Sequence, residues 1–128
     1  MPACSILVVD DEPLLRGFVQ QMLERAGHRV ASAEDGRKAS EQMQQQPFDL
    51  VVTDLLMPER DGIELIDELR RQYPSVRIVA MSGGGRIGRE QYLQIAKGFG
   101  AHVLLEKPFS AKQLLAAVEH ALGASTAA

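Results

Sequence analysis

The sequence predicts an α/β domain built on a five-stranded parallel sheet with helices on both faces. Five short, continuous apolar runs alternate with segments in which apolar residues recur every three or four positions. Strict alternation of this kind is typical of strand–helix units whose strands are buried on both faces. The apolar runs lie at about 5–9, 29–33, 49–53, 77–81 and 102–105.

The helical segments are recognised by their apolar faces and their end signals. The first stops at Gly27, and the last opens at Ser110, a suitable N-cap. Those between them span about 36–46, 62–73 and 89–98. The apolar face of the first segment consists of Leu15, Phe18, Val19, Met22 and Leu23. Right-handed crossovers leave few topologies for five such units, and the doubly wound, flavodoxin-like (βα)5 order 2-1-3-4-5 is the usual one.

Length and composition indicate one soluble domain. The chain has 128 residues, 45% hydrophobic and 24% charged, which suffices for a single core. We expect one domain over 1–128, with a core at about 5–122 and a flexible tail at 123–128. The net charge of -3 gives no support to nucleic-acid binding. One cysteine, no signal peptide and no membrane-spanning apolar run predict a cytoplasmic protein without membrane contact.

Charged residues stand where three of the predicted strands end. Asp10 and Asp11 follow the first apolar run, Asp54 follows the third, and Lys107 follows the fifth. In an open parallel sheet, ligands bind beyond the carboxyl ends of the strands, so these residues should share one crevice. Clustered carboxylates repel one another unless a cation lies among them. The pattern therefore predicts a site for a hard metal ion with a lysine beside it.

The metal and its chemistry follow from the ligand type. Mg²⁺ binds through one or two carboxylates, keeps several waters and accepts phosphate oxygens as further ligands. Such a site could bring a phosphoryl group to a carboxylate nucleophile and form an aspartyl phosphate. A plainer interpretation stays open for Asp10 and Asp11, which could form a solvated turn with an Asp capping the first helix ahead of Pro13. Lys107 could likewise be an ordinary surface lysine.

Taken together, these residues resemble the receiver domain of two-component response regulators, over residues 5 to about 122. The resemblance is carried by Asp10, Asp11, Asp54-Leu-Leu-Met57-Pro58, Asp61-Gly62, Ser82 and Lys107-Pro108-Phe109. It implies a phosphorylation-controlled signalling module that takes a phosphoryl group from a histidine kinase or phosphotransfer protein and switches a face for a downstream target. It implies no turnover of an external substrate beyond self-phosphorylation and autodephosphorylation.

The resemblance also implies residue roles. Asp54 would be the phosphoacceptor. Asp10, Asp11, Asp54 and the backbone carbonyl of Leu56 would hold Mg²⁺. Ser82 and Lys107 would contact the phosphoryl oxygens, and the bond before Pro108 would be cis.

Two departures from the family concern the switch. Leu104 occupies a position where many receivers carry Tyr or Phe, and a leucine cannot make the polar or ring-edge contacts of those side chains. The spacing from Ser82 to Lys107 is also longer than we expect, with the excess in the glycine-rich stretch that follows Ser82. We therefore predict that the signal is carried by Ser82 and a switch loop containing Gly83, Gly84 and Gly85.

The same loop offers a rival interpretation. Gly83, Gly85 and Gly88 match a dinucleotide-binding pattern between a strand and a helix. That pattern normally occupies the first strand–helix turn, which here is acidic, so a nucleotide or flavin module is the weaker alternative. A phosphatase or phosphotransferase of the aspartyl-phosphate type is a second alternative. Such enzymes typically place a general acid two residues after the nucleophile, where this chain has Leu56. A degenerate receiver that binds partners without phosphorylation is a third.

Overall fold

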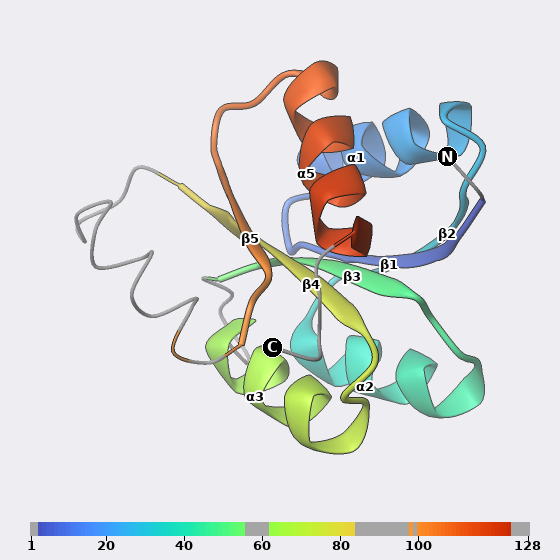
Figure 1. The fold of residues 1–128 in the computed structure, drawn as a ribbon, viewed down its shortest axis with the longest axis vertical. Coiled ribbons are helices and arrows are strands. Elements are labelled where there is room, and N and C mark those ends of the chain that lie inside the picture. The colour runs from blue at the N-terminus through green and yellow to red at the C-terminus, as the bar shows by residue number, and fades with distance from the viewer. Residues whose placement is uncertain (1–2, 56–61, 84–97, 99, 124–128) are drawn as a thin grey trace.

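The structure, a computed structural model, describes residues 3–55, 62–83, 98 and 100–123. It contains a five-stranded sheet in the order β2-β1-β3-β4-β5, and every neighbouring pair is parallel (Figure 1). This confirms the predicted fold and strand order. The strands are β1 (Ser5–Val9), β2 (Arg29–Ala33), β3 (Leu50–Asp54), β4 (Arg77–Ser82) and β5 (Val103–Glu106).

Helices cover both faces of the sheet. They are α1 (Pro13–Arg25), α2 (Gly36–Gln45), α3 (Gly62–Gln72) and α5 (Ala111–Gly123). Helices α1 and α5 lie on one face, and α2 and α3 lie on the other (Figure 1). Side chains of a strand alternate between the two faces, so β1 sends Ile6 and Val8 into one core cluster and Leu7 and Val9 into the other. Burial on both faces explains the unbroken apolar runs of the sequence.

Gly27 and Ser110 lie at helix ends, as the sequence predicts. Gly27 has a φ of 98° and follows α1. The next residue, His28, donates its backbone N–H to the Leu23 carbonyl at 3.2 Å, which closes a Schellman motif. At the start of α5, the Ser110 hydroxyl accepts the Gln113 N–H at 3.1 Å, and Gln113 Oε1 accepts the Ser110 N–H at 2.9 Å. This reciprocal pair is a capping box.

Some details differ from the sequence prediction. Asp54 is the last residue of β3 and not the first residue beyond it, since it still pairs with Met81. Ser82 ends β4, as expected, and pairs with Glu106. Phe18 is 36% exposed instead of buried with its neighbours on α1. Helix α5 continues through Gly123, one residue into the predicted tail. The predicted helix at 89–98 lies almost wholly outside the described residues, as does the tail beyond Gly123. Within the described part of the chain, no helix is long and apolar enough to cross a membrane.

Candidate functional site

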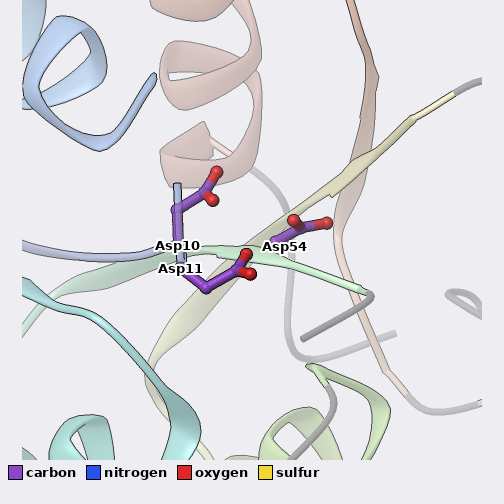
Figure 2. Close-up of side chains that lie close together, drawn as sticks. All are labelled: Asp10, Asp11 and Asp54. Atoms are coloured by element: carbon purple, nitrogen blue, oxygen red, sulfur yellow. The ribbon is translucent and has the colours of Figure 1, made fainter. Parts of the chain in front are cut away.

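Three carboxylates meet at the carboxyl edge of the sheet. Asp10 and Asp11 directly follow β1, and Asp54 ends the adjacent strand β3. One oxygen from each side chain lies within 4.8 Å of the corresponding oxygens of the other two. Figure 2 shows the three groups extending toward a common space beyond the strand ends. Asp10 and Asp54 are buried, whereas Asp11 is exposed, so the cluster opens to water on the Asp11 side.

Asp10 is held by several bonds. Its backbone N–H donates to the Ala33 carbonyl of β2 at 3.2 Å, and its Oδ1 accepts the Glu12 N–H at 2.9 Å. Its own carbonyl oxygen accepts a bond from Arg16 Nη1 at 2.7 Å. The plainer interpretation of the acidic pair is therefore correct only in part: Asp10 does close the turn ahead of α1. The N-cap residue itself is Glu12, whose side chain makes no capping bond.

Lys107 is the cation of the site. Its Nζ lies 3.1 Å from Asp54 Oδ2 and 3.5 Å from Asp10 Oδ2. Partial burial alone would lower the pKa of Lys107, but the carboxylates of Asp54 and Asp10 outweigh burial, so the pKa is raised and the ammonium is stabilised. The peptide bond between Lys107 and Pro108 is cis. Lys107 is therefore no ordinary surface lysine.

The excess of negative charge at the site favours binding of a divalent cation. Three carboxylates face one ammonium, so the cluster remains negative when all four groups are ionised. The ligand atoms are all oxygens, which suits a hard ion such as Mg²⁺. The exposed position of Asp11 would let such an ion keep part of its water shell. The donor set thus fits the metal that the sequence predicts.

Ser82 and Lys107 are tied together through the backbone. The Lys107 N–H donates to the Ser82 carbonyl at 2.7 Å, so the end of β4 and the residue after β5 are fixed to each other. Ser82 is buried, and Leu104 is half-buried against the core cluster on the α2 and α3 side. Gly83 has no positive φ. The remaining predicted loop and ligand positions, Leu56, Gly84, Gly85 and Gly88, lie outside the described residues.

An apolar groove adjoins the site and was not foreseen from the sequence. It has a volume of about 510 Å³ and runs from Glu12 and Lys107 to aromatic and aliphatic side chains of α1 and the segment before α5. The rings of Phe18 and Phe109 lie 6.4 Å apart between their centroids. Leu14, one turn earlier on α1, is 84% exposed. The sequence gives no sign of this groove, because helical periodicity assigns Phe18 to the core.

The fold and the acidic site define a signalling module of the receiver class. Residues 6–119 match the response regulator receiver domain family, and the chain belongs to this family of two-component signalling domains. It is 32% identical over 117 residues to the response regulator receiver protein CpdR of Brucella abortus and covers 95% of that protein. The acidic set Asp10, Asp11 and Asp54 is typical of the Mg²⁺ site of receivers.

Solved structures agree. Chemotaxis protein CheY4 of Vibrio cholerae superposes with a TM-score of 0.85 at 31% identity, over 94% of this chain and 99% of that one. The receiver domain of NtrX from Brucella abortus superposes with a TM-score of 0.85 at 35% identity, over 94% of this chain and 99% of that one. Receiver domains are in general signalling modules that pair with histidine kinases.

Several curated relatives are much longer than this chain. It is 33% identical over 128 residues to the DNA-binding transcriptional regulator NtrC of Azospirillum brasilense, yet it covers 26% of that protein. The chain thus spans about a quarter of the length of such regulators, and their DNA binding is a property of the longer proteins.

Proposed function

We propose that this chain is a phosphorylation-controlled switch in which Asp54 accepts a phosphoryl group from a phosphohistidine. One observation carries the proposal: the Asp54 carboxylate ends the central strand β3 with two carboxylates and the Lys107 ammonium around it. A carboxylate in this setting has a nucleophilic oxygen, a cation for the incoming charge and oxygen ligands for a metal. We assign this activity to a single receiver domain with its core at about residues 5–122.

The proposed reaction transfers the phosphoryl group directly. An oxygen of Asp54 attacks phosphorus, the P–N bond to the donor imidazole breaks, and its electron pair returns to the ring nitrogen. Lys107 exchanges its contact with Asp54 Oδ2 for the phosphoryl oxygens, which a point-charge donor suits. Asp10, Asp11 and Asp54, together with the backbone carbonyl of Leu56, would hold Mg²⁺. The ion, when bound, would offset the negative charge of the carboxylates and the phosphoryl group.

The proposed switch begins at Ser82. A phosphoryl group adds about -1.5 to -2 charges and strong acceptor oxygens, toward which the Ser82 hydroxyl would turn. Because Ser82 and Lys107 share a backbone hydrogen bond, movement at either residue is transmitted to the other. Leu104 lacks the polar edge of an aromatic switch residue, so we assign the altered face to Ser82 and the loop that begins at Gly83, presented to a downstream protein.

We place the phosphodonor protein on the groove lined by Leu15, Phe18 and Phe109. A phosphohistidine must reach Asp54 across the rim of the site, and the groove starts at that rim with Glu12 and Lys107. Leu14 and Phe18 add exposed apolar surface on the adjoining turns of α1. Such a groove suits an amphipathic helix that carries the histidine at its charged edge. The occupant we propose is therefore a helical domain of a histidine kinase or phosphotransfer protein.

Phosphoacceptor identity is tested by intact mass. The native chain, incubated with acetyl phosphate and Mg²⁺, should gain one phosphoryl group, and Asp54→Ala should gain none. Glu64→Ala, which removes a carboxylate from the first turn of α3, is the control and should still be phosphorylated. An adduct that survives in Asp54→Ala would refute the assignment.

Donor docking is tested separately. Leu14→Asp should slow transfer from a phosphotransfer protein roughly tenfold, because a charge would be placed in a desolvated apolar contact. The donor is the phosphotransfer protein that phosphorylates the native chain fastest in a panel. Transfer from acetyl phosphate should be unchanged, because a small donor needs no groove. Gln44→Asp adds the same charge on α2, across the sheet, and should alter neither rate. Equal slowing with both donors would contradict a docking role.

A further inference from the structure

The guanidinium of Arg16 fixes the backbone that presents the acidic pair. Arg16 lies in the first turns of α1 and donates from Nη1 to the Asp10 carbonyl oxygen at 2.7 Å. Two carboxylates that line the same pocket as Arg16 have other cations: Glu34 pairs with Lys38, and Glu41 lies 3.6 Å from Arg37. The Arg16 donor is thus left for the end of β1.

This bond acts on Asp11 through the peptide plane. The Asp10 carbonyl and the Asp11 nitrogen belong to one planar unit, so fixing the oxygen fixes the direction in which the chain leaves Asp10. The other end of Asp10 is fixed as well, since its N–H donates to Ala33 and its Oδ1 accepts the Glu12 N–H. Held at both ends, the turn keeps the backbone of the exposed Asp11 where its carboxylate can join those of Asp10 and Asp54.

We propose that Arg16 is a positioning residue for the divalent-cation site, which it serves without touching the ion. The proposal rests on the function proposed above, in which the three carboxylates hold Mg²⁺. Partners that orient metal ligands commonly affect metal affinity about 10- to 100-fold. The charge of Arg16 and its hydrogen bond should have opposite effects on Mg²⁺ affinity. A nearby positive charge repels a cation, so simple electrostatics predicts tighter Mg²⁺ binding once Arg16 is neutral, whereas positioning predicts weaker binding.

The test compares Arg16→Met, Arg16→Lys and Arg25→Met. Mg²⁺ affinity is measured by titrating backbone amide NMR signals, and the melting temperature without metal is recorded for each variant. Arg16→Met should weaken Mg²⁺ binding roughly tenfold. Arg16→Lys keeps a donor and the charge and should recover most of the affinity. Arg25→Met removes the same charge from the exposed last turn of α1 and should bind as the native chain does. Unchanged or tighter binding by Arg16→Met would overturn the proposal.

A measurement on the native chain covers the case in which Arg16→Met does not fold. With ¹⁵N-labelled arginine and no metal, the Arg16 Nη hydrogens should exchange slowly with solvent compared with those of exposed Arg25, and should shift when Mg²⁺ is added. Fast exchange with no response to Mg²⁺ would refute the role. If the native chain binds no Mg²⁺ at all, the proposed metal site fails and Arg16 fails with it. If native and Arg16→Met bind equally, only the role of Arg16 fails.

Discussion

The two ends of the parallel sheet use polar side chains in opposite ways. At the amino end, three side chains accept hydrogen bonds from backbone N–H groups. His28 Nδ1 accepts the Cys4 N–H at 3.1 Å, His102 Nδ1 accepts the Ile78 N–H at 3.0 Å, and Asp49 Oδ2 accepts the Ser5 N–H at 2.8 Å. At the carboxyl end, three carboxylates and one lysine face one another. The side chains at the amino end thus act as acceptors for the backbone, whereas the carboxyl end places three carboxylates against the Lys107 ammonium.

This difference shows how a receiver separates stability from function. A parallel sheet leaves backbone groups at both ends, and those that are shielded from water need partners. Strand starts meet that need with side chains that act as acceptors. At the carboxyl end the carboxylates repel one another, and a bound divalent cation would relieve that repulsion. Substitutions at the carboxyl end should therefore change Mg²⁺ affinity and phosphorylation, whereas substitutions at the amino end should change the free energy of unfolding.

The largest contrast is expected between two aspartates, Asp11 and Asp49. Asp11→Ala should weaken Mg²⁺ binding by more than roughly tenfold and abolish phosphorylation, because a proposed ligand is lost. Its stability without metal should stay the same or rise as repulsion is relieved. Asp49→Ala also removes an exposed carboxylate, at the other end of the sheet. It should bind Mg²⁺ normally but lose about 1 kcal/mol of unfolding free energy, because the Ser5 N–H loses its acceptor.

Metal titration and urea unfolding of both variants, with and without Mg²⁺, check this contrast. The comparison between the two ends would be wrong if Asp11→Ala lost as much stability in metal-free buffer as Asp49→Ala does. It would also be wrong if Asp49→Ala lost its response to Mg²⁺.

A smaller effect is expected at Lys107. Lys107→Met removes the cation between Asp10 and Asp54, and Asp10 is fully buried. Without metal, the unfolding free energy at pH 7.5 should fall by about 1–3 kcal/mol, because a buried carboxylate loses its charged partner. Bound Mg²⁺ should restore most of this loss by mass action. The phosphoryl adduct should still form in part, but the amide shifts that accompany it should be reduced.

Lys112→Met, at an exposed position on α5, is the matched control and should show neither effect. A loss in Lys107→Met that Mg²⁺ does not reverse would mean that Lys107 matters for packing and not for charge.

The carboxyl end could be predicted from the sequence because its residues are placed by strand ends. Asp10 and Asp54 directly follow apolar runs and Lys107 lies one residue beyond another, and parallel topology brings strand ends together without further information. Arg16 could not be found this way. Its contact depends on the reach of a flexible side chain back to a carbonyl six residues earlier, which no periodicity records. The prediction that Phe18 is buried is wrong for a related reason. Helical periodicity does not show that Phe18 and Phe109, which are distant in the sequence, pack together at the edge of a groove.

The amino end was missed altogether. The Nδ1 atoms of His28 and His102 each accept the backbone N–H of a residue 24 positions earlier in the chain. That role depends on the register between neighbouring strands, which the sequence does not state. The switch loop and Leu56 remain predictions, because they lie outside the described residues.

The smallest expected effect is a pH dependence that comes from the amino end. Burial lowers the pKa of His28, and burial together with Arg70 and Arg77 lowers the pKa of His102. Both Nδ1 atoms accept backbone N–H groups, which a protonated imidazole cannot do. A histidine whose folded-state pKa is depressed contributes stability that is complete above its unfolded pKa, about 6.5. That stability is lost as the pH falls below this value, because the unfolded chain takes up protons that the folded chain resists.

The double variant His28→Gln/His102→Gln should therefore be less stable than the native chain at pH 7.5, by on the order of 1 kcal/mol for each weakened bond. At pH 5.5 the difference should shrink, because only the native chain gives up histidine-linked stability as the pH falls. Urea midpoints at the two pH values measure this. Mg²⁺ affinity at pH 7.5 should be the same in both proteins, since both histidines lie at the opposite end of the sheet from Asp54. A gap between native and variant that stays constant with pH would show that the histidines only fill space, and a change in Mg²⁺ affinity would show that the two ends are not independent.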